Sequence, residues 1–102
     1  MFALIVRFHC RDEAAASDFD ALVTATTQKI REYEPGTLAY TVHRVDGEPL
    51  QRIFYELYRD RDAFNAHEAQ EYVKEFLEAR DSFITSHEVD FLSPTIQTRL
   101  PG

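Results

Sequence analysis

Hydrophobic and polar positions along this chain follow two different periods, which predict an alternation of strands and helices. Residues 2–9 form a short, mostly apolar run that is typical of a strand. From 12 to 33, apolar side chains recur at spacings of three and four, which predicts one buried face of a long helix. Asp12 is placed to cap that helix at its start, and Pro35 with Gly36 ends it.

The second half of the chain repeats this order of strand, helix and strand. Asp46 and Gly47 form a turn signal between two strands of a hairpin. The order βαββαβ predicts an α+β, ferredoxin-like fold with an antiparallel sheet, formed by a single domain over 1–102. The predicted elements of this half are strands over 38–45 and 52–58, a helix from Asp60 to about 69, a helical segment over 71–83, and a last strand over 88–92.

The two faces of the predicted sheet are both apolar. In the strand over 52–58, one face carries Ile53, Tyr55 and Leu57, and the other face is largely aromatic. An antiparallel sheet with one solvated face alternates cleanly between apolar and polar residues, and this one does not. The predicted helices can cover only one face. A second copy of the chain is the simplest cover for the other face, so we expect a homodimer.

Composition limits the classes of partner and cofactor. Eleven basic residues against 18 acidic ones give a net charge of −7 without a basic run, so we expect no nucleic-acid or membrane partner. Cys10 is the only cysteine, which excludes an intrachain disulfide and favours a reduced, cytoplasmic setting. With three glycines and four histidines that lack metal-ligand spacing, the sequence predicts no nucleotide, flavin or metal cofactor.

His67 is the first candidate for chemistry. Phe64 and Ala63 lie three and four residues earlier, so the imidazole shares a helical face with apolar side chains that could line a pocket. An ordinary imidazole titrates near pH ~6.5 and can take a proton from an acidic phenol near neutrality. The alternative is a structural histidine, half-buried and bonded to a carbonyl group or a water molecule.

Aromatic side chains gather around His67 in the predicted order of elements. Flat ring ligands gain about 0.5–1.5 kcal/mol per stacked pair on such side chains. Tyr72 could also donate a hydrogen bond to a developing oxyanion. The alternative is an ordinary aromatic core. The candidate wall comprises Phe54, Tyr58, Tyr72 and Phe76.

Glu56 shares a strand face with Phe54 and Tyr58. A carboxylate in that position must be hydrogen-bonded or have a raised pKa, and either condition marks a candidate site. An ion pair with Arg7 or Arg52 is the interpretation that we favour for it.

Three runs of sequence carry the most informative arrangement of aromatic residues, acidic residues and the histidine. The run Phe-Tyr-Glu-Leu-Tyr-Arg-Asp over 54–60 places an aromatic residue at the end of a strand, and the next helix brings His67 beside it. Glu-Tyr-Val-Lys-Glu-Phe follows over 71–76, and Glu-Pro-Gly-Thr-Leu-Ala-Tyr precedes both over 34–40. Over nearly the whole chain this layout resembles the antibiotic biosynthesis monooxygenase domain family. The resemblance implies a dimeric α+β barrel, and several members of that family oxygenate aromatic polyketides or quinols without metal or flavin.

The resemblance also implies roles for individual residues. The leading hypothesis is a cofactor-independent monooxygenase that uses dioxygen to oxidise a phenolic, quinol or polyketide-like aromatic to a quinone, with His67 as base and Tyr72 as oxyanion contact. Relatives that degrade haem bind iron through a histidine near the position of Leu77, so the resemblance implies no haem. The rival hypotheses are a proton-transferring isomerase of a small keto or enol compound and a non-catalytic ligand-binding module. The implied substrate-binding residues are Phe54, Glu56, Tyr58, Phe64 and Phe76.

Overall fold

The computed structural model describes residues 1–98 as one antiparallel sheet with three helices. The strands and helices follow the predicted βαββαβ order, and the second helical region consists of two segments, as the sequence predicted. This arrangement confirms the α+β, ferredoxin-like fold. The elements are β1 (Phe2–Cys10), α1 (Glu13–Tyr33), β2 (Thr37–Val45), β3 (Glu48–Tyr58), α2 (Arg61–Glu68), α3 (Glu71–Arg80) and β4 (Ile84–Leu92).

Two strands are longer than the sequence predicted. β3 begins at Glu48 instead of 52, because its ladder with β2 continues to the turn, where Val45 pairs with Glu48. β4 begins at Ile84 instead of 88, because it pairs along the full length of β1 up to Cys10. The helix before it therefore stops at Arg80, three residues earlier than expected.

Aspartate side chains cap the N-termini of two helices, as predicted. The side chain of Asp12 accepts a hydrogen bond from the backbone N–H of Ala15 at 2.7 Å. Asp60 does the same for Ala63 at 2.8 Å. Each satisfies one of the N–H groups that the first turn of a helix leaves without a partner. Gly47 has φ +80° in the β2–β3 turn, a backbone region that favours glycine.

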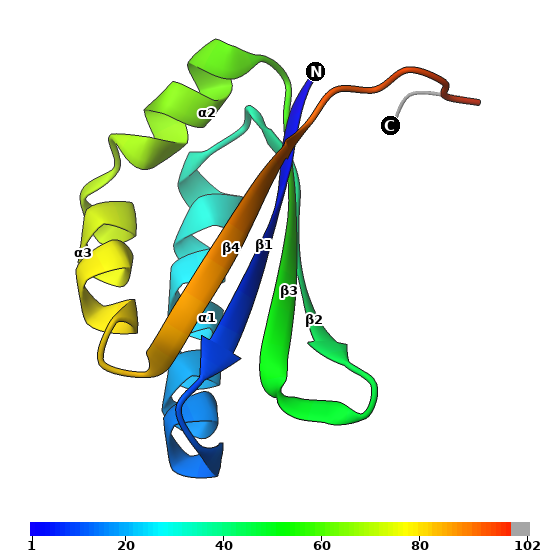
Figure 1. Ribbon diagram of the computed structural model, residues 1–102. Helices are drawn as coiled ribbons and strands as arrows, with labels where there is room; N and C mark the ends of the chain where they lie inside the picture. Colours follow the sequence, from blue (N-terminus) through cyan, green and yellow to red (C-terminus); the bar gives the residue numbers. More distant parts are fainter. Residues whose placement is uncertain (99–102) are drawn as a thin grey trace.

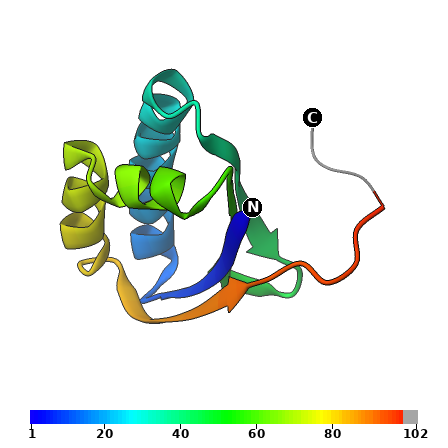
Figure 2. The ribbon, with the colours of Figure 1, turned by 90° about the horizontal axis from the view of Figure 1, so that it is seen from above.

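All three helices lie on the same face of the sheet, whose strand order is β2-β3-β1-β4 (Figure 1). In the view from above, α2 and α3 lie beside α1 and leave the opposite face of the sheet without a helix (Figure 2). No helix among residues 1–98 is long and apolar enough to cross a membrane. The core between the layers includes Leu4, Val6, Phe8, Phe19, Val23, Phe54, Tyr58 and Phe76.

The opposite face of the sheet is apolar at its centre. Ile5 on β1 pairs with Tyr55 on β3, and both side chains are half-buried, as is Ile53. Beyond β4, the chain borders a hollow of about 210 Å³ on this face, next to Met1 and Leu57. The central apolar strip therefore has little cover within one chain.

Candidate functional site

A cavity of about 210 Å³ lies between the sheet and helices α2 and α3. Alternate residues of β1 and β3 form its floor, because the two-residue period of a strand turns them to the helix side. The helices supply its wall, and β4 supplies one edge of its mouth. Its lining includes Phe8, Tyr40, Phe54, Glu56, Phe64, His67, Phe76, Arg80, Val89 and Phe91.

His67 on α2 lines this cavity and is only 4% exposed. Its Nδ1 lies 2.7 Å from Oε1 of Glu34, the residue that ends α1. An ionised carboxylate can only accept hydrogen bonds, so Nδ1 carries a proton and donates it. Among residues 1–98, the imidazole forms its side-chain hydrogen bond through Nδ1 only, and Nε2 keeps some accessible surface, so it is not one of the fully buried atoms without a partner. The pair therefore fixes the tautomer in which Nε2 can accept a proton.

Glu34 is 8% exposed and accepts three side-chain hydrogen bonds. Besides His67, the hydroxyl of Thr37 donates to it at 2.8 Å, and the hydroxyl of Tyr72 donates to Oε2. Burial alone would raise the pKa of Glu34, but the hydrogen bonds from His67, Tyr72 and Thr37 outweigh burial and lower it. Glu34 is thus ionised near neutrality and orients the imidazole.

Glu56 on β3 is the second buried carboxyl of the site, at 6% exposure. Its Oε1 accepts a hydrogen bond of 2.6 Å from the hydroxyl of Tyr58. Burial raises the pKa of Glu56, and the hydrogen bond from Tyr58 and the electrostatic interaction with His67 offset this only in part. A carboxyl that keeps its proton more readily than usual therefore borders the same cavity as the His67 base.

The prediction that Glu56 forms an ion pair with Arg7 or Arg52 is wrong. Arg7 faces the other side of the sheet and donates to Gln51 at 2.6 Å. Arg52 shares the face of Glu56 but lies four residues along β3, a separation of roughly 13 Å. There it forms a bidentate pair with Asp20 of α1, with N–O distances of 2.9 and 3.0 Å.

The structure brings most of the predicted site residues together, and two of them lie behind the cavity wall. Tyr58 is fully buried, and its ring centroid lies 5.3 Å from those of both Phe64 and His67. The hydroxyl of Tyr72 donates a hydrogen bond to Glu34. Burial first, and then this carboxylate, raise the pKa of Tyr72. Both tyrosines thus hold residues of the site in position. The predicted residues that line the cavity are Phe54, Glu56, Phe64, His67 and Phe76.

Glu34 and Tyr40 belong to the site but were not assigned a role from the sequence. The sequence contains a signal for a role of Glu34, because a carboxylate at a helix C-terminus faces the negative end of the helix dipole and needs a strong hydrogen-bond partner. The sequence contains no such signal for Tyr40, since an aromatic residue on a strand normally packs in the hydrophobic core. Its ring lies 5.6 Å from that of His67. Burial first, and then the charges of Glu56 and Glu34, raise the pKa of Tyr40 well above its usual value, so its hydroxyl stays a donor.

Aromatic and aliphatic side chains from β4 border the mouth of the cavity. Phe91 is 64% exposed and meets the ring of Phe64 edge-on at 6.1 Å. Val89 lies two residues earlier on the same strand face and is also exposed. An apolar ligand can therefore reach the interior along a largely apolar edge.

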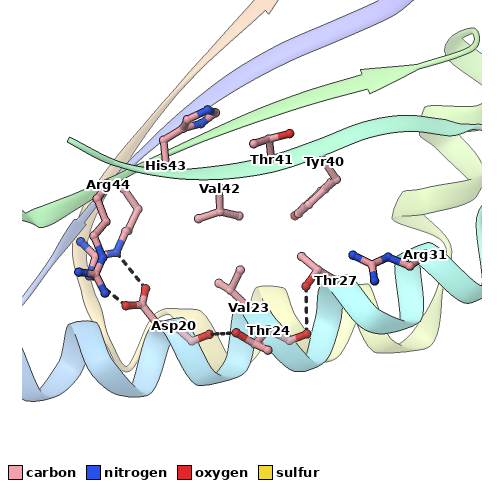
Figure 3. A pocket seen from close by; sticks show the side chains of 11 residues that line it. Asp20, Val23, Thr24, Thr27, Arg31, Tyr40, Thr41, Val42, His43 and Arg44 are labelled. Carbon is pink, nitrogen blue, oxygen red and sulfur yellow. Dashed lines mark hydrogen bonds and ion pairs between the residues drawn. The ribbon is translucent and has the colours of Figure 1, made fainter. Parts of the chain in front are cut away.

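A larger hollow of about 440 Å³ lies between α1 and the edge strand β2 (Figure 3). Val23 and Val42 face each other across it, and Arg31 lies toward one end. The hydroxyls of Thr24 and Thr27 donate to carbonyl groups of their own helix, at 2.8 and 3.0 Å. No predicted site residue lines this groove, and many of its polar groups already have partners. We therefore place the candidate site in the cavity under α2 and α3.

Metal binding has no support in the described part of the chain. Among residues 1–98, no group of three or more His, Cys, Asp or Glu side chains is arranged to hold a metal ion. The other histidines lie apart from the cavity: His9 pairs with Glu88 at 3.0 Å, and His43 and His87 are exposed on β2 and β4.

Comparison with known proteins identifies relatives of this arrangement. The family model described as antibiotic biosynthesis monooxygenase matches residues 1–79, whereas no curated protein matches. A candidate antibiotic biosynthesis monooxygenase from Caulobacter crescentus is 22% identical, with 93% of this chain and 90% of that chain covered and a TM-score of 0.86. Rv0793 from Mycobacterium tuberculosis is 24% identical, with 96% and 98% covered and a TM-score of 0.85. At such identities these structures show a shared fold. The family match spans most of the sequence, and this chain therefore belongs to the antibiotic biosynthesis monooxygenase family.

Proposed function

We propose that this protein is a cofactor-independent monooxygenase that uses dioxygen to oxidise a small phenol or quinol to a quinone. The observation that carries the proposal is the Glu34–His67 pair, which leaves Nε2 in an aromatic cavity without a partner among residues 1–98. A base held in this way can take the proton of a bound hydroxyl group. Membership of the family supports the reaction class.

The substrate itself serves as the source of electrons. Loss of a proton to His67 makes the ring electron-rich, so that it can pass one electron to dioxygen. The superoxide then combines with a ring carbon, and the resulting hydroperoxide loses water to give the quinone oxygen. One oxygen atom ends in the product and the other in water, so no further reductant is required.

Two groups that burial makes slower to release their protons can stabilise the oxygen anions of this sequence. Glu56 and Tyr40 both line the cavity, and burial raises the pKa of each. Donors that are held in place at a buried site stabilise developing negative charge without having to reorganise. We assign this task to Tyr40 and Glu56 instead of Tyr72, whose hydroxyl already donates to Glu34.

The size of the cavity favours a small substrate. Its volume of about 210 Å³ lies below the ~300 Å³ at which pockets for drug-sized ligands begin. One ring or a fused pair of rings is the substrate class that we propose. A larger polyketide would have to displace Phe64 or Phe91 at the mouth.

Oxygen uptake with naphthoquinol tests the proposal. We expect uptake above the rate of autoxidation without protein, and a fall of about 10²–10⁴ in kcat/KM for His67→Ala. His43→Ala serves as the control, because His43 is exposed on β2 outside this cavity. Equal activity in wild type and His67→Ala, or no uptake by the wild type, would contradict the proposal.

A proton-transferring isomerase is the second candidate. It is favoured by the presence of a base, His67, and a proton-holding carboxyl, Glu56, on the walls of one cavity. Such an enzyme would exchange substrate hydrogen with deuterium from solvent and consume no oxygen. Exchange into a small keto compound without oxygen uptake would favour the isomerase over the monooxygenase.

A further inference from the structure

Arg80 brings a cation to the wall of the cavity, with no acid within hydrogen-bond range among residues 1–98. Its Nε is buried, and among residues 1–98 it is the only buried side-chain nitrogen or oxygen without a hydrogen-bond partner. The nearest acid is the exposed Asp81, whose Oδ1 lies 3.8 Å from Nε, beyond hydrogen-bond range. The side chain of Arg80 is 18% exposed. A guanidinium keeps its charge at neutral pH, so the buried Nε–H is left to donate to an acceptor on a bound ligand, and an anionic acceptor suits it best.

Arg80 lies at the Phe8 end of the cavity, and its charge also acts on Tyr40. Its guanidinium lies over the ring of Phe8, 5.5 Å from the centroid. On β1, Phe8 pairs with Arg52, whereas Leu4 pairs with Glu56, so the two ends are four residues apart along the sheet, or roughly 13 Å. The rings of Phe54 and Phe76 line the cavity too, with centroids 6.3 Å apart.

We propose that Arg80 binds a carboxylate on the substrate, so that the substrate class is a small aromatic carboxylate with a phenolic hydroxyl. This inference rests on the proposed function and adds the group that orients the ring. The carboxylate would lie at the Phe8 end and the hydroxyl near His67. Arginine suits this task, because its planar fork can donate two parallel hydrogen bonds to one carboxylate.

Other acids around the cavity do not supply this anion. Glu34 is engaged by His67, Tyr72 and Thr37, and Glu56 by Tyr58. Glu68 is exposed on α2, and no ion pair joins it to Arg80 among residues 1–98.

Binding of two inert probes tests the role of Arg80 without any turnover. The probes are 2-naphthoate and its neutral isostere 2-naphthamide, titrated by calorimetry. We expect wild type to prefer the carboxylate by about tenfold or more, and Arg80→Met to lose that preference while it binds the amide as before. Arg80→Lys should keep part of the preference. Lys74→Met, on the exposed side of α3, controls for the loss of one positive charge.

Oxygen uptake with naphthoquinol on the same samples separates this inference from the proposed function, because that substrate carries no carboxylate. Equal binding of both probes by wild type, or a preference that survives in Arg80→Met, would overturn the inference even if naphthoquinol is oxidised. A preference that depends on Arg80 would support it even if no oxygen is consumed, and then only the monooxygenase proposal fails.

Discussion

The pKa values of two buried carboxyls of the site are shifted in opposite directions because their partners differ. Glu34 accepts hydrogen bonds from three donors and has a lowered pKa. Glu56 has one strong donor, Tyr58, and burial raises its pKa. Groups whose environments push their pKa values apart are suited to opposite roles in proton transfer. Glu34 therefore acts through His67 as a positioning residue, and Glu56 can serve as a donor.

The raised pKa of Glu56 predicts a dependence of stability on pH. The folded protein holds this proton more tightly than the unfolded chain, so the contribution is complete below the ordinary pKa of 4.5 and is lost as pH rises through the folded value. Glu56→Gln cannot lose a proton and still accepts from Tyr58. We expect the free energy of unfolding of the variant, relative to wild type, to increase as the pH rises from 4.5 towards neutrality.

Urea denaturation over that pH range measures this difference. Glu75→Gln, which removes one negative charge from the exposed side of α3 outside the cavity, controls for net charge. A difference between Glu56→Gln and wild type that stays constant with pH would show that Glu56 has no raised pKa in the folded protein.

At the scale of elements, the corner between α1 and β2 packs closely on α2. A Cβ atom added at Gly36 would lie 2.7 Å from Cβ of Ala63, which is too close for two carbon atoms. The carbonyl of Gly36 also accepts a hydrogen bond of 2.9 Å from the N–H of Arg59. Glu34 precedes this corner, and His67 follows Ala63 by one helical turn. The contact between Gly36 and Ala63 therefore sets the geometry of the Glu34–His67 pair.

Gly36→Ala should therefore destabilise the protein by about 1–3 kcal/mol, the usual range for overpacking. Ala63→Gly removes the opposing atom at a cost of about 1 kcal/mol for glycine in a helix. We expect the double variant Gly36→Ala/Ala63→Gly to lose less stability than the two single variants together. Urea denaturation of the four proteins measures this. If the losses of stability in the two single variants add up to the loss in the double variant, the side chains at the two positions do not clash.

Local signals in the sequence predict much of this arrangement. The caps Asp12 and Asp60, the Gly47 turn and the helical face of His67 depend on neighbours in sequence, so the pattern of residues predicts them. The contact between His67 and Glu34 joins residues 33 apart. It depends on how α2 packs against the α1–β2 corner, which no periodicity encodes.

The errors at the site have the same physical origin. Tyr72 is close to His67 in sequence, yet its hydroxyl turns to Glu34, because an ionised carboxylate is the stronger acceptor. Glu56 was paired with arginines by sequence reasoning, whereas Arg52 lies nearer to Asp20 across the interface of α1 and β3. Side-chain partners between elements were thus the least predictable part.

At the scale of the molecule, the half-buried face around Ile5, Ile53 and Tyr55 predicts a homodimer in which two sheets pack face to face. Light scattering should give about twice the chain mass of 11.9 kDa. Tyr55→Glu should shift the protein towards monomer, because it places a charge in the apolar interface. Thr24→Glu, on the exposed side of α1, should leave the mass unchanged. A wild-type mass of one chain would contradict the dimer.

Transfer of labelled oxygen tests the proposed activity most directly. Wild type is mixed with naphthoquinol under ¹⁸O₂, the product is analysed by mass spectrometry after a rapid quench, and the His67→Ala variant is treated in parallel. The account predicts a hydroxylated quinone that carries one labelled oxygen atom, formed much more slowly by the variant. Unlabelled quinone with released hydrogen peroxide, or the same labelled yield from both proteins, would contradict it.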